Sequence, residues 1–287
     1  MTILVTGATG NVGSNVVAQL VNRGAEVRAL VRDPSKASFP DVVEVAQGDL
    51  LDVDSLRSAM NGVSTLFLLN GVVADEFTQA LIALNLAREA GIERIVYLSV
   101  IHSDIYVNVP HFAGKFGVER MIEQMGMGAT ILRPAYYMDN EITIKDAITG
   151  YGIYPMPIGD KGLAMIDARD IGEIAAIELI RREESATLLP LTRLNLVGPD
   201  TLTGASAAAI WSDVLGREIA YPGDDTAGFE QNMSQFMPGW MAYDMRLMAE
   251  RFVSDGMLPE PGDVDRLTTL LDRPLRTYRD YVAQIAG

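Results

Sequence analysis

Hydrophobic residues follow two patterns in the first 133 positions. Some stand together in short continuous runs, and others recur every three to four residues. The continuous runs predict strands at 3–6, 26–31, 42–46, 64–69, 94–99 and 129–133. The helical spacings between them predict helices at about 12–21, 52–60, 77–87 and 110–125. This alternation predicts right-handed βαβ crossovers, and so an α/β fold built on a doubly wound parallel sheet.

The alternation ends after Pro134. Residues 151–162 are rich in proline and glycine and predict a loop. A helix at 167–182, which Asp167 could cap, and a strand at 193–197 are expected next. Beyond residue 200 we expect two or three helices and a short strand at 218–221. Two domains follow from this pattern, at 1–150 and at 151–287, with 164–199 returning to the first; the second is smaller and of mixed α/β structure.

Three glycines separate the first predicted strand from the first predicted helix, in Gly7-Ala8-Thr9-Gly10-Asn11-Val12-Gly13. Gly7 would allow a sharp turn, Gly10 would let the backbone approach a pyrophosphate, and Gly13 would let the helix pack close to the sheet. A helix N-terminus offers free N–H groups and a partial positive charge to an anion. The strand–turn–helix context therefore favours a dinucleotide site over a purely structural turn. The residues predicted to form it are Gly7, Thr9, Gly10, Asn11, Val12 and Gly13.

The end of the second predicted strand favours NADP(H) over NAD(H). An NAD site usually has Asp or Glu there to bind the ribose 2′-hydroxyl, but this strand ends at Arg32. A guanidinium suits a 2′-phosphate, and Lys36 could add a second charge. The alternative is that Arg32 pairs with Asp33 or another surface acid. Asp49, after the third strand, could bind the adenine amino group or cap the helix that begins near residue 52.

With these motifs, the sequence resembles the NmrA-like group of atypical short-chain dehydrogenases/reductases. The matching segments, in the family's order, are 6–13, 30–32, 97–99, 132–140, 166–171, 196–199 and 272–278. The resemblance implies a Rossmann domain, a small C-terminal domain and an NADP(H) site between them. It does not imply one function, because the family includes quinone and azo-dye reductases, relatives of isoflavone reductases, and redox-sensing regulators with little or no turnover.

The family also directs attention to the helix after the fifth strand. Short-chain dehydrogenases generally use a serine together with Tyr-x-x-x-Lys on this helix, whereas this chain has His111 and Lys115 at those two positions. Ser99 ends the fifth strand, and Ile101 stands where extended members often place their catalytic hydroxyl. The Ser–Tyr–Lys triad is therefore not intact.

His111 and Lys115 are the predicted catalytic residues, because positions i and i+4 share one face of a helix. Lys115 would bind the nicotinamide ribose and stabilise a developing oxyanion. His111 would donate a proton after hydride transfer. The alternatives are an exposed ion pair of Lys115 with Glu119, and a helix-start role for His111 with hydrogen bonds to backbone or water. His102 is expected at the surface.

The other predicted cofactor contacts follow strands, at the sheet edge where open α/β folds bind ligands. They are Asp49, Leu50, Leu69, Asn70, Gly71, Ser99 and Tyr136, together with Arg32 and Lys115. Predicted substrate contacts are Tyr137, Met138 and Trp240, with Phe236 and Tyr243 as further candidates. Aromatic and methionine side chains at such spacings often belong to a core instead. A mostly apolar pocket would favour a planar quinone, an aromatic carbonyl or an enone.

Composition limits the partners. Hydrophobic residues make up 48% of the chain and charged residues 21%, as in ordinary soluble globular proteins. A net charge of −15 makes nucleic acids and anionic membranes poor partners. The absence of cysteine excludes disulfides and thiolate metal sites, and with two histidines no metal site is expected. We find no signal-peptide pattern and no apolar run of about 18 residues, so we expect a cytoplasmic protein without a transmembrane helix.

The sequence thus predicts an NADP(H)-dependent oxidoreductase. It would transfer hydride between nicotinamide and a small, largely apolar carbonyl, enone or quinone, and act as a monomer or homodimer. The alternative is a non-catalytic, NADP(H)-sensing regulatory protein of the NmrA type, which the missing tyrosine would permit.

Overall fold

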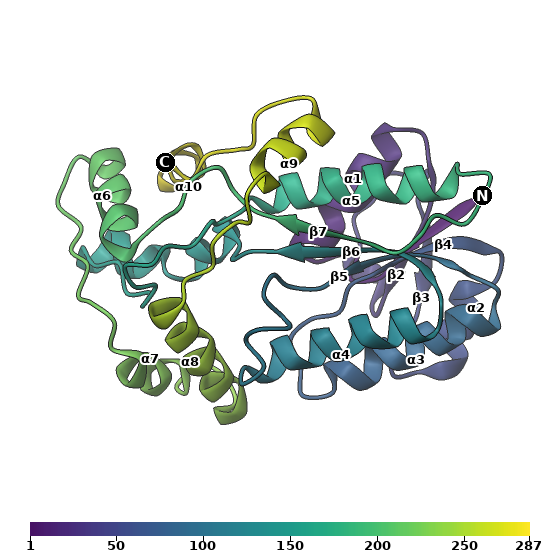
Figure 1. Ribbon diagram of the computed structural model, residues 1–287, viewed down its shortest axis with the longest axis horizontal. Coiled ribbons are helices and arrows are strands. Elements are labelled where there is room, and N and C mark those ends of the chain that lie inside the picture. Colours follow the sequence, from purple (N-terminus) through teal and green to yellow (C-terminus); the bar gives the residue numbers. More distant parts are fainter. The chain divides into compact units, whose positions relative to one another are not determined.

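The computed structural model describes all residues, 1–287, and is organised around a seven-stranded sheet (Figure 1). The strands are β1 (Thr2–Val5), β2 (Glu26–Val31), β3 (Glu44–Gln47), β4 (Val63–Leu68), β5 (Arg94–Leu98), β6 (Gly128–Pro134) and β7 (Thr192–Leu196). Their order is β3-β2-β1-β4-β5-β6-β7, and each pair from β3 to β6 is parallel. Because β2 and β4 lie on opposite sides of β1, the strand order reverses at β1, where such sheets bind ligands. The predicted α/β fold with a doubly wound sheet is confirmed.

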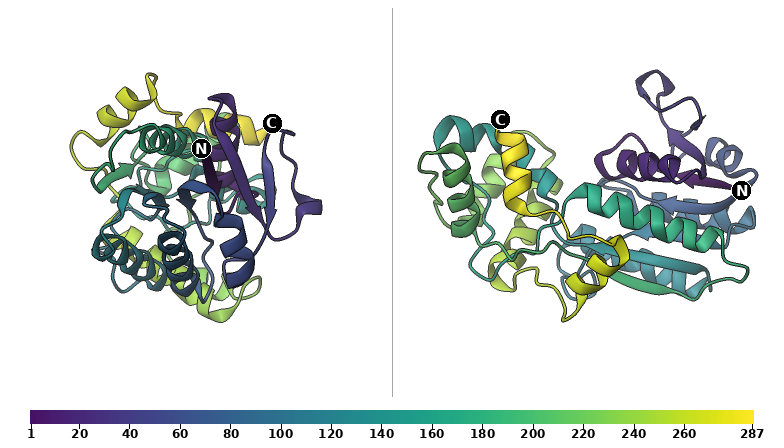
Figure 2. Two further views of the ribbon diagram at one scale, coloured as in Figure 1. Left: turned by 90° about the vertical axis from the view of Figure 1, so that its right-hand side faces the viewer. Right: turned by 90° about the horizontal axis from the view of Figure 1, so that it is seen from above.

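Helices cover both faces of the sheet (Figures 1 and 2). They are α1 (Asn11–Asn22), α2 (Val53–Met60), α3 (Glu76–Glu89), α4 (Pro110–Gln124) and α5 (Ala168–Glu183). Seen from above, α1 and α5 lie side by side over the sheet (Figure 2, right). Gly172 permits this approach, because a Cβ there would come 2.5 Å from the Cβ of Asn15.

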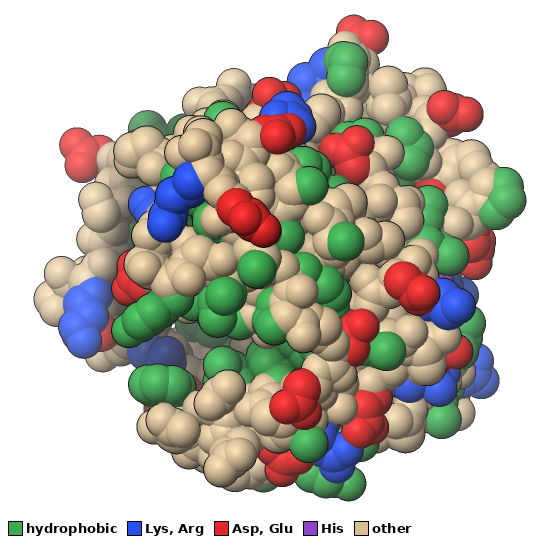
Figure 3. Space-filling view, turned by 90° about the vertical axis from the view of Figure 1, so that its left-hand side faces the viewer, with side chains coloured by type: hydrophobic (Ala, Val, Ile, Leu, Met, Phe, Trp, Pro, Cys, Tyr) green, Lys and Arg blue, Asp and Glu red, His purple; other side chains and the backbone are tan.

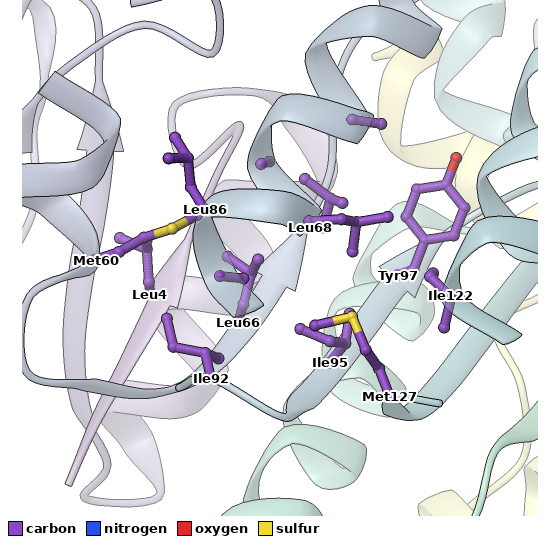
Figure 4. Packing of buried hydrophobic residues seen from close by; sticks show 14 of the residues in the cluster. Leu4, Met60, Leu66, Leu68, Leu86, Ile92, Ile95, Tyr97, Ile122 and Met127 are labelled. Atoms are coloured by element: carbon purple, nitrogen blue, oxygen red, sulfur yellow. The ribbon is translucent and has the colours of Figure 1, made fainter. Parts of the chain in front are cut away.

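The opposite face carries an apolar core between the strands and the helices α2, α3 and α4 (Figure 4). Leu4, Leu66 and Ile95 come from three neighbouring strands, and Met60 and Leu86 meet them from α2 and α3. Burying one such side chain stabilises the fold by about 1.5–3 kcal/mol. The strand ends that precede the candidate site are therefore held on a tightly packed scaffold.

Element boundaries agree closely with the sequence pattern, apart from β3. This strand begins two residues later than expected, at Glu44, because the N–H of Val43 donates to the carbonyl of Pro40 and closes a turn. No helix in the structure combines the length and apolarity needed to span a membrane.

The chain divides into two compact units made of separate segments. The first unit comprises 1–100, 114–133 and 168–194, and the second comprises 101–113, 134–167 and 195–287. The first holds β1 to β6 up to Arg133 and most of the helices that cover the sheet. The domain limits predicted at residues 150 and 151 stay a prediction.

The second unit is mainly helical. A 3₁₀ helix (Met138–Thr143) and a π-helical turn (Ala147–Tyr151) precede α6 (Gly204–Leu215), α7 (Thr226–Met233), α8 (Gly239–Ser254), α9 (Asp263–Leu271) and α10 (Tyr278–Ala286). Two expectations are wrong here. Five helices replace the expected two or three, and three of them, α7, α9 and α10, have only eight or nine residues. The strand expected at 218–221 is reduced to a single bridge between Ala220 and Ile153.

The surface of the second unit mixes apolar and acidic side chains (Figure 3). Three aromatic residues around the start of α8 are exposed, by 82% for Phe236, 41% for Trp240 and 47% for Tyr243. These residues therefore do not belong to the core of the unit.

Candidate functional site

The turn after β1 requires glycine at two of its three positions. Gly7 has φ +63°, and the N–H of Gly10 closes the turn on its carbonyl at 3.0 Å. A Cβ on Gly7 would lie 2.0 Å from Cδ2 of Leu69, and a Cβ on Gly13 would lie 2.1 Å from the carbonyl oxygen of Gly7. The backbone of α1 thus approaches β1 as closely as the chain allows.

The N-terminus of α1 is open to an anion. Its N-cap residue, Gly10, has no side chain to accept from the first N–H groups, and the first turn contains no acidic residue. Thr9, Gly10 and Asn11 are exposed, whereas Val12 and Gly13 are buried beneath them. Free N–H groups and the positive end of the helix dipole favour a phosphate at this position.

Thr6 joins the carboxyl ends of β1 and β4. Its hydroxyl donates to the carbonyl of Leu69 at 2.7 Å and accepts from the N–H of Leu69 at 2.8 Å. The next residue, Asn70, is 7% exposed, and its side-chain amide donates to the carbonyl of Glu76 at 2.7 Å. Gly71 is exposed. Three predicted cofactor contacts are therefore held in one short segment beside the glycine turn.

At the end of β2, Arg32 is exposed and its guanidinium makes no ion pair or hydrogen bond. The expected alternative, a pair with Asp33, is wrong. Asp33 instead accepts from the side chain of Ser35 at 2.6 Å and lies 3.6 Å from Nζ of Lys36. The hydrogen bonds from Ser35 lower the pKa of Asp33. Arg32 thus remains an unpaired positive charge at the end of β2, the strand beside β1.

After β3, Asp49 and Leu50 are both half-buried. Asp49 does not cap α2, because Asp52 occupies that position and accepts from the N–H groups of Asp54 and Ser55 at 3.2 and 3.3 Å. Asp49 accepts from the N–H of Leu51 at 2.9 Å. The capping alternative for Asp49 is therefore wrong.

Lys115 on α4 forms a buried ion pair. Its Nζ lies 2.6 Å from Oε1 of Glu76 on α3, and the two side chains are 10% and 7% exposed. The expected alternative, an exposed pair with Glu119, is wrong. Glu119 is fully buried and binds Arg133 through two contacts of 3.0 and 2.6 Å. The ammonium of Lys115 is consequently held by a carboxylate of α3 and not by one of its own helix.

Two hydroxyl groups lie close to these carboxylates. Ser99, directly after β5, donates to Oε1 of Glu119 at 2.5 Å. The hydroxyl of Tyr97 is buried without a hydrogen-bond partner, and Figure 4 shows it at the end of the ring that points away from Ile95. Burial, and next the charges of Glu76 and Glu119, raise the pKa of Tyr97. The neutral phenol is therefore the stable form.

His111, in the second unit, binds a carboxylate. Its Nδ1 lies 2.5 Å from Oδ1 of Asp244 on α8, and its backbone N–H donates to Oδ2 of the same residue at 3.1 Å. The side chains of His111 and Asp244 are 9% and 2% exposed. The expected alternative, hydrogen bonds to backbone or water alone, is wrong.

His102 was expected at the surface, but it is half-buried. Its backbone has φ 58°, and its Nδ1 lies 3.3 Å from the hydroxyl of Tyr106.

The predicted residues after β6 differ in exposure. Tyr136 is half-buried, its hydroxyl lies 3.9 Å from Sδ of Met156, and burial raises its pKa. Tyr137 is half-buried, and Met138 is fully buried with its N–H donating to the carbonyl of Ile166 at 2.9 Å. Trp240 keeps an exposed indole. Within the second unit, Met138 is therefore part of the core.

Comparison with protein families identifies the chain. The model of the NmrA-like family matches residues 1–272. The chain belongs to the NmrA-like family. The resemblance seen in the sequence motifs is thereby confirmed.

The proteins that are similar to this NmrA-like chain include reductases. The NAD(P)H azoreductase of Xenophilus azovorans is 30% identical over 284 residues, which cover 97% of this chain and 96% of that protein. Quinone oxidoreductase 2 of Escherichia coli is 26% identical over 99% of this chain and 98% of that protein. The crystal structure of the Escherichia coli NADPH-dependent quinone oxidoreductase with NADPH superposes with a TM-score of 0.87, at 26% identity and over 100% of both chains.

Three residues of this NmrA-like protein were not found from the sequence. Thr6 precedes the glycine motif but carries no pattern of its own, and Glu76 resembles any exposed acid at a helix start. Asp244 lies 133 positions after His111, so only the fold brings them together. The helix α8 also contains Arg246, Glu250 and Arg251, so no feature of its sequence distinguishes Asp244.

Proposed function

We propose that this NmrA-like protein is an NADP(H)-dependent oxidoreductase that transfers hydride between nicotinamide and a small, largely apolar carbonyl, enone or quinone. One observation carries the proposal: the open N-terminus of α1 follows β1, where the strand order reverses, and the unpaired guanidinium of Arg32 follows the adjacent strand β2. The activities for which the azoreductase and quinone oxidoreductase relatives are named support the reductase class.

The residues of the first unit fit a dinucleotide. Backbone N–H groups around Gly10 would bind the pyrophosphate, since no Cβ covers them, and Arg32 would bind the 2′-phosphate. The other proposed contacts are Gly7, Thr9, Asn11, Val12, Gly13, Asp49, Leu50, Leu69, Asn70, Gly71, Ser99, Lys115 and, from the second unit, Tyr136. When bound, NADPH supplies the hydride.

Lys115 is the proposed electrostatic residue. Its ammonium is buried and held by Glu76, so it keeps one orientation before any ligand binds. We assign it a hydrogen bond to the nicotinamide ribose and a stabilising field for negative charge on the acceptor. A charge fixed in advance stabilises such a state without reorganisation.

His111 is the proposed proton donor. It stands in the first turn of α4, one turn before Lys115, and its ring is oriented by Asp244. A histidine gives or takes a proton near neutral pH, which suits an acceptor that becomes an alkoxide or a hydroquinone anion. Tyr137 and Trp240 stay predicted substrate contacts, of which Trp240 offers an exposed aromatic face, whereas Met138, predicted with them, is buried in the core.

A steady-state assay tests the proposal. NADPH absorbance would be followed with quinones, enones and aromatic aldehydes as acceptors. We expect turnover with at least one of them, and a loss of about tenfold or more in Lys115→Ala, or roughly 1.4 kcal/mol of barrier. Lys161→Ala, which alters an exposed lysine of the second unit, is the control. Tight NADPH binding without turnover on any acceptor would overturn the enzyme assignment and favour a nucleotide-sensing protein.

A small molecule is the proposed partner. The cytoplasmic location and the monomeric or homodimeric state predicted from the sequence remain predictions.

A further inference from the structure

Asp244 directs both of its carboxylate oxygens at one residue. Oδ1 contacts the ring of His111 at 2.5 Å, and Oδ2 accepts from the backbone N–H of His111 at 3.1 Å. Both side chains are more than nine-tenths buried. The carboxylate is therefore committed to His111 and is shielded from water.

This contact decides which ring nitrogen carries hydrogen. An ionised carboxylate can only accept hydrogen bonds, so the hydrogen of the shared contact belongs to Nδ1. Nε2 makes no hydrogen bond within the protein. The other nitrogen of a histidine takes its role from the partner of the first, so Nε2 is left for an external group.

We propose that Asp244 is a positioning residue that holds His111 with hydrogen on Nδ1, so that Nε2 exchanges the proton with the hydride acceptor. This inference rests on the proposed function, but its structural part, the tautomer, does not depend on turnover. The acceptor would be a molecule whose oxygen or nitrogen gains a proton on reduction.

A carbonyl or quinone oxygen is the proton acceptor in this step. The acceptor carries an additional electron pair after it has received hydride, and its oxygen takes the proton from Nε2 of the imidazolium. The N–H bond at Nε2 breaks and an O–H bond forms. The ring becomes neutral and keeps the hydrogen on Nδ1 toward Asp244, and water then returns a proton to Nε2.

The position on α4 makes a carboxylate partner necessary for this role. His111 lies in the first turn of α4, where the positive end of the helix dipole opposes an imidazolium. Asp244 supplies the compensating negative charge. The ring of Phe112 packs against that of His111 edge to face, with centroids 4.7 Å apart, and this contact also limits ring rotation.

Helix capping is the purely structural explanation for Asp244. Oδ2 satisfies one N–H group of the first turn of α4, as a capping side chain would. A cap needs one oxygen and no charge, however, whereas Oδ1 contacts the ring. The test must therefore separate capping from orientation of the imidazole.

Nuclear magnetic resonance measures the tautomer directly. The chain has only two histidines, so in protein with isotopically labelled histidine His102→Gln assigns the signals. In the neutral form of the ring, the long-range proton–nitrogen correlations of His111 should show hydrogen on Nδ1. Hydrogen on Nε2 in the unsubstituted protein would overturn the proposal, whatever its activity.

Kinetics with Asp244→Asn provides the second measurement. Asparagine keeps the size and a capping oxygen but removes the charge, so we expect kcat to fall about tenfold or more with KM changed less than about twofold. Asp225→Asn is the matched control, because Asp225 accepts from the N–H of Gly228 at 2.9 Å as a simple cap of α7. An equal loss in both variants, or an unchanged kcat in Asp244→Asn, would contradict a positioning role. A protein with the Nδ1 tautomer but no turnover would refute only the proposed enzyme function.

Discussion

Nζ of Lys115 lies 2.6 Å from Oε1 of Glu76, and neither side chain is more than 10% exposed. A buried pair of this kind offsets the loss of hydration only while both charges are present. The pair joins α4 to α3 and holds a positive charge beside the carboxyl ends of the central strands. Lys115 is therefore both a stability element and the proposed source of the electrostatic field.

Glu76→Gln should destabilise the protein markedly. It leaves the ammonium of Lys115 buried without a counter-charge, and such losses cost about 3 kcal/mol or more of unfolding free energy. Adding Lys115→Met should restore much of that loss, because no uncompensated charge remains. Urea unfolding of both single variants and the double variant measures the coupling. Additive effects would show that the two side chains do not interact as the distance indicates.

Arg32→Glu should weaken binding of NADPH far more than binding of NADH. The substitution replaces the proposed ligand of the 2′-phosphate by a repelling charge, and NADH has no such phosphate. Arg88→Glu is the control. It changes the net charge equally, but Arg88 lies in the last turn of α3, away from the carboxyl ends of the strands. Equal losses for the two nucleotides in Arg32→Glu would place the 2′-phosphate elsewhere.

Gly10→Ala should keep the fold and weaken NADPH binding. Gly10 has φ −80°, which alanine accepts, and its added Cβ would be 3.2 Å from the carbonyl of Gly7. The methyl group would stand where the backbone has to approach a pyrophosphate, so we expect an increase in Kd of about tenfold or more. Gly150→Ala, where a Cβ meets nothing within 4 Å, is the control. Unchanged NADPH titration curves for Gly10→Ala would argue against this cradle.

Glu141 should make stability fall as pH rises. Burial raises its pKa to about 7, although the hydrogen bonds from Tyr278, Tyr154 and Trp211 oppose this shift. Because the unfolded carboxyl ionises near pH 4.5, the folded protein holds a proton between about pH 4.5 and 7 that the unfolded chain has released. The stabilisation is thus complete below about pH 4.5 and is lost as the pH approaches 7, by up to about 3 kcal/mol in all.

Glu141→Gln stays neutral and should lack this dependence. As the pH rises across this interval, the unsubstituted protein should therefore lose unfolding free energy relative to Glu141→Gln. Urea unfolding at several pH values measures it, and Glu218→Gln, at an exposed acid of the second unit, should follow the unsubstituted protein. A constant difference between pH 4.5 and 7 would disprove the raised pKa of Glu141.

The repeating part of the fold could be predicted because each of its elements carries a complete local signal. The strand 26–31 was placed without error, and the helix expected at about 12–21 extends from Asn11 to Asn22. Gly7 and Gly13 could likewise be assigned from one motif, since Gly7 has φ +63° and a Cβ on Gly13 would lie 2.1 Å from the carbonyl oxygen of Gly7. The short helices α7, α9 and α10 lie outside this alternation of strands and helices, and their number was not predicted.

Side-chain pairings could not be predicted when the partners are distant in sequence. Lys115 was expected to pair with Glu119, one turn away on the same helix, but Glu119 turns to Arg133 on β6 and Glu76 arrives from α3. The same limit applied to His111, because Asp244 lies 133 positions later in the chain. Local spacing identifies which residues share a helix face, and only the tertiary fold selects among their partners.

Calorimetric titration of the unsubstituted protein with NADPH and NADH tests the central claim most directly. The open N-terminus of α1 and the unpaired Arg32 predict saturable binding of both nucleotides, with NADPH bound more tightly. If neither nucleotide bound, the account would be contradicted, because the glycine turn would then be a structural feature alone.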